Sequence, residues 1–259
     1  MTETIDPLKV LQSIRTVTGG YEAQTLPTAH GSIFGAYLLF QQVLIAEMAA
    51  PGKRVLSIQT VFANGGTSGQ PCQISVETLQ SGRSFAFITL TFRQGDLVVS
   101  RAEVMLTTDE ADYLHHRNAG LPPEAVDTWA QTPPGLWPGA AHRWPGSSIE
   151  QLDVRFSLAE QPSPSVTRAL VALASEPAVM ASLMGFVDVK AASPGRVPGN
   201  VLTQTITLLE PADLVAGMVI RSAPRYAGQG RVHGDGTIMD VSGNLLATFD
   251  TTGVLREPR

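Results

Sequence analysis

The chain has 259 residues and a formal net charge of −5, and 43% of its residues are hydrophobic while 16% are charged. This composition excludes a largely disordered chain and supplies enough apolar side chains for a sizeable core. The negative charge argues against a broad nucleic-acid surface, which needs clustered Lys and Arg, and the single cysteine, Cys72, excludes an intramolecular disulfide.

Residues 1–108 predict an N-terminal domain in the order β-α-β-β-β-β. A short strand is expected around residues 17–24, and a helix over residues 33–50 ends at Pro51 and Gly52, because Pro cannot continue a helix and Gly tolerates the cap geometry. Four runs rich in β-branched and aromatic residues predict the remaining strands. These runs are residues 54–63, 72–80, 83–92 and 97–106.

The helix over residues 33–50 is the most apolar stretch of the first half. It contains Gln41, Gln42 and Glu47, which make it too polar for a membrane span. We therefore expect a helix that is buried in the core of a soluble protein, and no membrane partner.

Residues 109–148 interrupt this pattern, and residues 149–259 repeat it as a C-terminal domain. The interruption is rich in Pro and Gly with scattered Trp, which predicts a linker whose Trp residues dock on the body. A strand over 149–158 and a helix over 165–189, interrupted at Pro177, open the repeat. Four further strand-like runs complete it, at residues 201–209, 217–226, 230–240 and 244–255.

The last hairpin of each half carries a similar motif, GDLVVS at residues 95–100 and GNLLAT at residues 243–248. We expect a repeated hairpin there and no chemistry from its turn. A curved antiparallel sheet has one apolar face, which a helix covers, and two such sheets can join their edges. The sequence therefore predicts an α+β fold of two repeats that form one long antiparallel sheet with two central helices.

Several spaced motifs follow one another in the order of a known family. They are Phe34-Gly35, Val76-Glu77-Thr78-Leu79, Gly82-Arg83-Ser84-Phe85, Gln94-Gly95 and Gly253-Val254-Leu255-Arg256, with Ala36 in place of a second helix-start glycine. This pattern resembles the acyl-CoA thioesterase II-like family, whose members have two hotdog domains in one chain. The resemblance spans nearly the whole chain. It implies hydrolysis of acyl-CoA to a free acid and CoA, no cofactor apart from the CoA of the substrate, and a homo-oligomer.

The resemblance also indicates candidate catalytic residues, because the family is similar in using an Asp, a Thr and a Gln of its C-terminal half to direct a water at the thioester. Glu176 stands at the place of the Asp and is one methylene longer. Val201 stands at the place of the Thr, and Thr251 at the place of the Gln. If the register differs by a residue or two, nearby side chains would supply the missing groups. The catalytic candidates are therefore Glu176, Thr203, Gln204 and Thr251.

Each catalytic candidate has an alternative, structural interpretation. Glu176 would be a first-turn acid that complements the helix dipole, if Ser175 capped a helix in which Pro177 sits early. Thr203, Gln204 and Thr251 would be solvent-facing residues, because polar side chains that alternate along a strand usually point to water. Both interpretations are open at the level of the sequence.

Three residues of the first half are candidates for substrate binding. Gly35 lies at a helix start, where unpaired amides can bind an oxyanion. Gln41 falls where the family usually has a Gln one turn into the helix, and its alternative role is to bond a neighbouring backbone group. Arg83 is one of several Arg residues that would contact the phosphates of CoA, unless these are scattered surface charges.

Other site chemistries have no support in the sequence. His115, His116 and His142 lack partners at metal-ligand spacing, so no metal is assigned. A Gly-x-Ser-x-Gly elbow is absent and no motif surrounds Cys72, so nucleophilic catalysis is not indicated. A His/Asp arrangement that would hydrate an enoyl thioester is not seen at a helix start either. The main hypothesis is a thioesterase that uses direct water attack, and its rival is an inactive hotdog that binds acyl thioesters as a binding or assembly module.

The sequence also favours a location in the cell. Its start, MTETIDPLKVLQS, contains acids and an early Pro where a secretory signal has basic residues and an apolar run. A chain with one cysteine also fits a reducing compartment. We expect a cytoplasmic protein of fatty acid metabolism.

Overall fold

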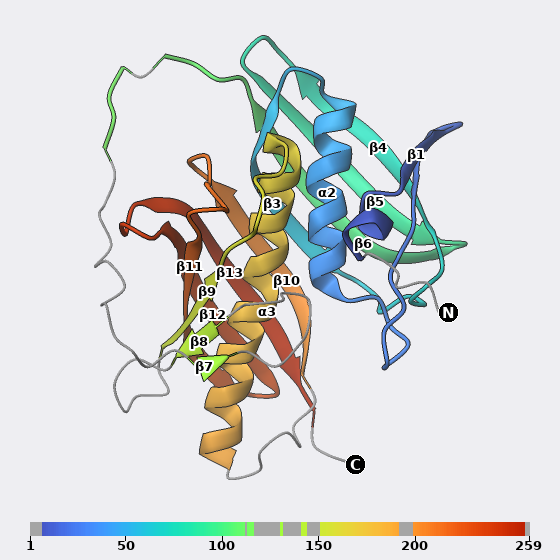
Figure 1. Ribbon diagram of the computed structural model, residues 1–259. Coiled ribbons are helices and arrows are strands. Elements are labelled where there is room, and N and C mark those ends of the chain that lie inside the picture. The colour runs from blue at the N-terminus through green and yellow to red at the C-terminus, as the bar shows by residue number, and fades with distance from the viewer. Residues whose placement is uncertain are drawn as a thin grey trace, which may run out of the picture. The chain divides into compact units, whose positions relative to one another are not determined.

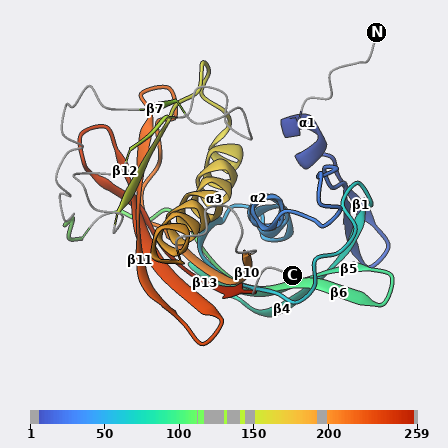
Figure 2. The same cartoon turned by 90° about the horizontal axis from the view of Figure 1, so that it is seen from below.

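The computed structural model describes residues 7–111, 113–116, 130–131, 141–143, 151–191 and 199–256. The chain forms two compact units, Met1–Glu110 (unit 1) and Ala111–Arg259 (unit 2). In each unit a long helix lies on one face of an antiparallel sheet (Figures 1 and 2). Most of the predicted linker, residues 109–148, lies outside the described residues.

Unit 1 is a sheet with the strand order β1-β2-β4-β5-β6-β3, and α2 lies against β3, β5 and β6. Its elements are α1 (Pro7–Leu11), β1 (Ile14–Val17), β2 (Gly20–Ala23), α2 (Gly35–Ala49), β3 (Arg54–Phe62), β4 (Cys72–Ser81), β5 (Phe85–Gln94) and β6 (Leu97–Thr107). The single strand predicted around 17–24 is instead a hairpin of β1 and β2. Gly20 permits its close approach to β4, because a Cβ at this position would lie 2.0 Å from the carbonyl oxygen of Ile74.

Helix α2 is a core helix, as expected, since 11 of its 15 residues are buried. Its two glutamines are fully buried, and both have hydrogen bonds. Gln42 accepts from the Thr60 hydroxyl at 2.7 Å and donates to the Ser100 hydroxyl at 3.4 Å. Burying these amides is tolerated because each hydrogen bond replaces one to water.

Unit 2 has the strand order β10-β13-β12-β11-β9-β8-β7. Its elements are β7 (Ala130–Gln131), β8 (Ala141–Arg143), β9 (Leu152–Phe156), α3 (Pro164–Ala191), β10 (Gly199–Leu208), β11 (Met218–Gly228), β12 (Arg231–Asp240) and β13 (Leu245–Leu255). Strands β7 and β8 belong to the segment predicted as a linker, and they extend the sheet of unit 2 beyond β9.

Helix α3 is continuous, so the predicted interruption at Pro177 is wrong. Proline removes one backbone hydrogen bond and kinks a helix, but packing on both sides of Pro177 keeps the helix together. The segment Pro164–Val187 is long and apolar enough to cross a membrane, and 67% of its most apolar window is buried inside the structure. That environment is the one a core helix occupies.

The two units share the same irregularities in strand pairing. The β3–β6 pairing shifts between Val55 and Ser57, and the β10–β13 pairing shifts between Val201 and Thr203. The β4–β5 pairing shifts after Thr78, as the β11–β12 pairing does after Pro224. The β5–β6 pairing shifts after Phe92, as the β12–β13 pairing does after Ile238. Bulges are built-in features of a fold, so their agreement supports a structural repeat. Equating them places the Ile58–Val104 pair of unit 1 at the position of the Gln204–Thr251 pair of unit 2.

The hairpin motif found in the sequence does mark the last hairpin of each unit, but its residues are not equivalent one by one. The turn of unit 1 is residues 95–96, whereas residues 241–244 connect β12 to β13. Ser100 is fully buried, while Thr248 at the matching motif position is half-buried. An offset of one residue exchanges the two faces of a strand, so the bulges give the correct alignment.

Glycines allow α3 to lie close to its sheet. A Cβ at Gly234 of β12 would lie 2.8 Å from the carbonyl oxygen of Ala223 and 3.2 Å from side-chain atoms of Val179 and Leu183 on α3. The equivalent residue in unit 1 is the full-sized Ile88, which is opposite Val104 as Gly234 is opposite Thr251.

We predict that Gly234→Ala lowers the free energy of unfolding by about 1–3 kcal/mol, because the added methyl overpacks the space beneath α3. Denaturant unfolding measures this change. Gly82→Ala is the matched control, since its nearest contact would be at 3.6 Å, and its effect is expected to stay within about 0.5 kcal/mol. Equal effects of the two substitutions would contradict close packing at Gly234.

Candidate active site

Three buried polar side chains of unit 2 meet beneath the middle of α3. Ser175 belongs to α3, Gln204 to β10 and Thr251 to β13, and their exposed fractions are 0%, 1% and 0%. Gln204 and Thr251 are directly opposite each other in the sheet. Both face the helix, since side chains two residues apart share one face and the neighbouring inward positions hold Ile206 and Phe249.

A chain of hydrogen bonds links these residues, and we call it the Ser175–Gln204–Thr251 chain. The Thr251 hydroxyl donates to Gln204 Oε1. Gln204 Nε2 donates to Ser175 Oγ at 3.0 Å, and the Ser175 hydroxyl donates to the backbone carbonyl of Ala172 at 2.7 Å. The amide of Gln204 is therefore held at both ends.

Glu176 follows Ser175 along the helix and is only 3% exposed. Its Oε2 has no hydrogen-bond partner among the residues that the structure describes. Burial raises the pKa of its carboxyl from 4.5 to about 8, because desolvation penalises the charged form. A buried acid with a perturbed pKa, one oxygen of which has no partner in the described part of the chain, is a candidate for a functional site.

The structural interpretation of Glu176 as a first-turn acid is wrong. Ser175 and Glu176 lie in the middle of α3, far from its start at Pro164. Ser175 does not cap a helix, since its hydroxyl bonds back to Ala172. The dipole of a helix end therefore gives no stabilisation to the Glu176 carboxylate.

The structure does not bring Thr203 to the Ser175–Gln204–Thr251 chain. Thr203 precedes Gln204 on the strand, so its side chain faces the side of the sheet away from α3, and it is half-buried. It is paired with Thr252, whose hydroxyl lies 3.1 Å from His233 Nδ1. Of the four catalytic candidates, Gln204 and Thr251 are in contact, and Glu176 neighbours their partner Ser175.

Gln204 places a side-chain amide next to Thr251, which has a hydroxyl and no amide. By resemblance the family has a Gln where this chain has Thr251, and Gln204 places an amide directly across from that residue. The equivalent pair in unit 1 is apolar, Ile58 and Val104. This position therefore holds a polar pair in unit 2 and an apolar pair in unit 1.

The candidates of unit 1 occupy three different settings. Gly35 is the first residue of α2, and Phe34 before it makes no side-chain cap hydrogen bond. Gln41 donates to the backbone carbonyls of Leu11 and Gln24, as its alternative role expected, while its Oε1 has no partner among the described residues. Arg83 is exposed in the turn between β4 and β5.

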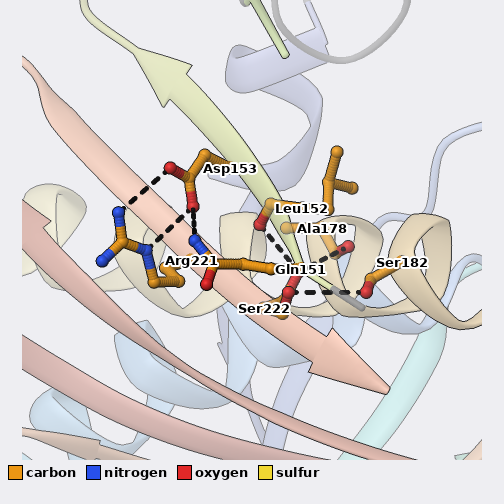
Figure 3. Close-up of polar contacts among 7 residues, drawn as sticks. All are labelled: Gln151, Leu152, Asp153, Ala178, Ser182, Arg221 and Ser222. Carbon is orange, nitrogen blue, oxygen red and sulfur yellow. Dashed lines mark hydrogen bonds and ion pairs between the residues drawn. The ribbon is translucent and has the colours of Figure 1, made fainter. Parts of the chain in front are cut away.

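A second polar cluster fixes α3 relative to β9 and β11 (Figure 3). Asp153 is fully buried, and its two carboxylate oxygens accept hydrogen bonds from Nε and Nη2 of Arg221 at 3.0 and 3.1 Å. The single hydroxyl proton of Ser222 is shared between the carbonyls of Ala178 on α3, at 3.2 Å, and Leu152 on β9, at 3.4 Å. The Ser182 hydroxyl donates to the Ser222 carbonyl at 3.5 Å. The bond from Ser222 to Ala178 ties α3, the helix that carries Glu176, to β11.

The described residues contain no group of three or more His, Cys, Asp or Glu that could hold a metal ion. The hydrogen-bonded chain contains an amide and two hydroxyls, and the buried carboxyl of Glu176 belongs to the residue after Ser175. A carboxyl can act as a base toward water, and an amide N–H can stabilise negative charge that develops on a carbonyl oxygen.

Comparisons with known proteins identify a similar sequence family and similar folds. Residues 23–107 match the family described as acyl-CoA thioesterase N-terminal domain. Similar solved structures include acyl-CoA thioesterase II TesB2 from Mycobacterium marinum, with 18% identity, a TM-score of 0.78 and coverage of 97% of this chain and 98% of that one. The tesB protein of Mycobacterium avium subs paratuberculosis has 20% identity, a TM-score of 0.78 and the same coverage.

A third similar structure is a hot dog fold protein from Alicyclobacillus acidocaldarius, with 18% identity, a TM-score of 0.72, and coverage of 99% and 100% of the two chains. No curated protein matches the sequence. The α+β double-hotdog fold and the resemblance to acyl-CoA thioesterase II-like proteins are confirmed.

We predict that a second substitution at the polar pair recovers most of the stability that the first one removes. Thr251→Val leaves Gln204 Oε1 buried without a donor, so it should destabilise the protein by about 1–3 kcal/mol. The double variant Gln204→Ile with Thr251→Val copies the apolar pair of unit 1 and should regain most of that loss. Urea unfolding compares the variants, and a double variant less stable than Thr251→Val would contradict this account of the pair.

Proposed function

We propose that this protein hydrolyses an acyl-CoA thioester to the free acid and CoA by direct attack of water. The observation that carries the proposal is the buried carboxyl of Glu176, with a pKa raised to about 8 and one oxygen without a partner in the described residues. A base with a pKa near the working pH is well suited to take a proton from water. The neighbouring Ser175–Gln204–Thr251 chain supplies the polar groups that such a reaction needs.

The proposed reaction has two steps. Glu176 takes a proton from water while the water oxygen bonds to the thioester carbonyl carbon, and the carbonyl electrons move to its oxygen. Gln204 has two amide N–H groups, one of which is bound to Ser175, and the other donates to this oxyanion. Collapse of the oxyanion breaks the carbon–sulfur bond, and the CoA thiolate takes the proton from Glu176. The mechanism uses no cofactor and no metal.

In this proposal Gly35, Gln41 and Arg83 contribute to binding the substrate and Thr203 takes no part in the chemistry. The resemblance supports an acyl-CoA substrate, a homo-oligomer and a role in fatty acid metabolism, and the single cysteine fits a reducing compartment such as the cytoplasm. We include these in the proposal. Neither nucleic acid nor a membrane is a proposed partner.

One observation favours the rival function, a hotdog that binds acyl thioesters without turnover. Gln204 and Thr251 are bonded within the chain and almost fully buried, as the members of a purely structural network are. In that case Glu176 would remain protonated in the folded protein and would have no role as a base.

We predict that Glu176→Gln lowers kcat/KM for acyl-CoA by about 10²–10⁴-fold, the usual contribution of a general base. In the wild type kcat/KM should rise with pH and level off above pH 8, where the carboxylate form dominates. Thiol release from a panel of short- to long-chain acyl-CoAs measures both.

Glu160→Gln is the matched control for charge, since Glu160 is exposed in the same unit. Binding of acyl-CoA without turnover at any chain length would establish the rival function. Turnover that Glu176→Gln leaves unchanged would exclude Glu176 as the base.

We also predict that Glu176→Gln stabilises the protein at high pH. The carboxyl keeps its proton up to about pH 8 when folded but loses it above its ordinary pKa of 4.5 when unfolded. The unfolded state then binds fewer protons, so the stability of the wild type falls as pH rises from 4.5 to 8. Gln does not titrate, and its advantage should grow across this window to a few kcal/mol. Parallel pH–stability curves for wild type and variant would contradict a raised pKa of the Glu176 carboxyl.

A further inference from the structure

We propose that Ser175 is a positioning residue of the site, and that it fixes which end of the Gln204 amide faces Thr251. Its role in turnover rests on the proposed function, in which Gln204 acts on the substrate. The orientation of the amide does not depend on that function. It follows from the hydrogen bonds of three buried residues.

The backbone carbonyl of Ala172 fixes which groups donate and which accept along the Ser175–Gln204–Thr251 chain. The Ala172 carbonyl can only accept, so the single hydroxyl proton of Ser175 is used there, at 2.7 Å. Ser175 Oγ is then left as an acceptor for Gln204, at 3.0 Å, and only Nε2 of the amide can donate to it. Oε1 must point the other way, toward Thr251.

Packing alone would not choose this orientation. The oxygen and nitrogen ends of an amide have nearly the same shape, and only hydrogen bonds distinguish them. Thr251 could donate to Oε1 or accept from Nε2 equally well, because a hydroxyl does both. Ser175, bound to a group that cannot donate, is the member of the chain that breaks this symmetry.

The orientation decides what the site offers a substrate. The Thr251 proton is used on Gln204 Oε1, so toward the site Thr251 Oγ1 acts as an acceptor. Such an acceptor suits a water, which has protons to give. The remaining N–H of Gln204 suits a thioester oxygen, which has only lone pairs. With the amide reversed, Gln204 would present its oxygen to that carbonyl, and the two would repel.

Ser182 provides a matched comparison on the same helix. It lies seven residues after Ser175 on the same face of α3 and is also 0% exposed. Its hydroxyl donates to the backbone carbonyl of Ser222, whereas the hydrogen bonds of Gln204 within the described residues go to Ser175 and Thr251. Ser175→Ala and Ser182→Ala thus both remove a buried hydroxyl, and of these two hydroxyls the one on Ser175 accepts a hydrogen bond from the Gln204 amide.

The test compares Ser175→Ala, Ser175→Thr and Ser182→Ala by kinetics on acyl-CoA and by NMR of protein labelled with ¹⁵N in the glutamine side chains. The Gln204 signal is identified by its loss in Gln204→Leu. In the wild type we expect two well-separated Gln204 amide protons, one of them bonded. Ser175→Ala should bring the two together and lower kcat by about 10–100-fold at unchanged KM, less than the loss of an oxyanion donor itself. Ser175→Thr keeps the hydroxyl and should restore both readouts.

Ser182→Ala should leave both the Gln204 signal and kcat unchanged. A Gln204 signal that is the same in wild type and Ser175→Ala would overturn the proposal, as would equal losses of kcat in the two alanine variants. An altered signal in Ser175→Ala, together with no turnover in the wild type, would support the positioning role and contradict the proposed hydrolysis.

Discussion

The desolvation of Glu176 is the constraint on which the site depends. A carboxyl in water would titrate near 4.5, and burial alone raises the pKa of this one to about 8. The helix that carries Glu176 lies close to its sheet at Gly234, which has no side chain, and the hydrogen bond from Ser222 to the Ala178 carbonyl ties α3 to β11. In the proposed mechanism this carboxyl is the reactive group, and holding it in an unfavourable environment exchanges stability for function.

The repeat shows where the two units diverge. Their bulges coincide, so the same scaffold was kept in both. At the equivalent position unit 1 has Ile58 and Val104, whereas unit 2 has Gln204 and Thr251. Unit 1 instead places its buried amide on the helix, where Gln42 bonds to Thr60 and Ser100. Unit 2 therefore carries a buried amide and hydroxyl on facing strands, whereas unit 1 carries the Gln42 amide on its helix.

Much of this fold could be predicted from the sequence, and the errors have physical causes. Helix α2 and the long strands follow from their apolar patterns and turn residues. Pro177 was taken to interrupt α3, but tertiary packing overrides a local helix breaker. Thr203 and Gln204 were equal candidates because the bulge that fixes which of them faces α3 leaves no mark in the sequence. Ser175 was considered only as a cap, since its contact with Gln204 joins residues 29 apart.

The most direct test of the account is titration of the Glu176 carboxyl itself. Infrared difference spectra between pH 4 and 10, with Glu176→Gln as the reference, isolate the band of its protonated form. The account predicts that this band persists at neutral pH and disappears with a midpoint near pH 8. Disappearance with a midpoint near pH 4.5 would show an ordinary, solvated carboxylate and would contradict the account.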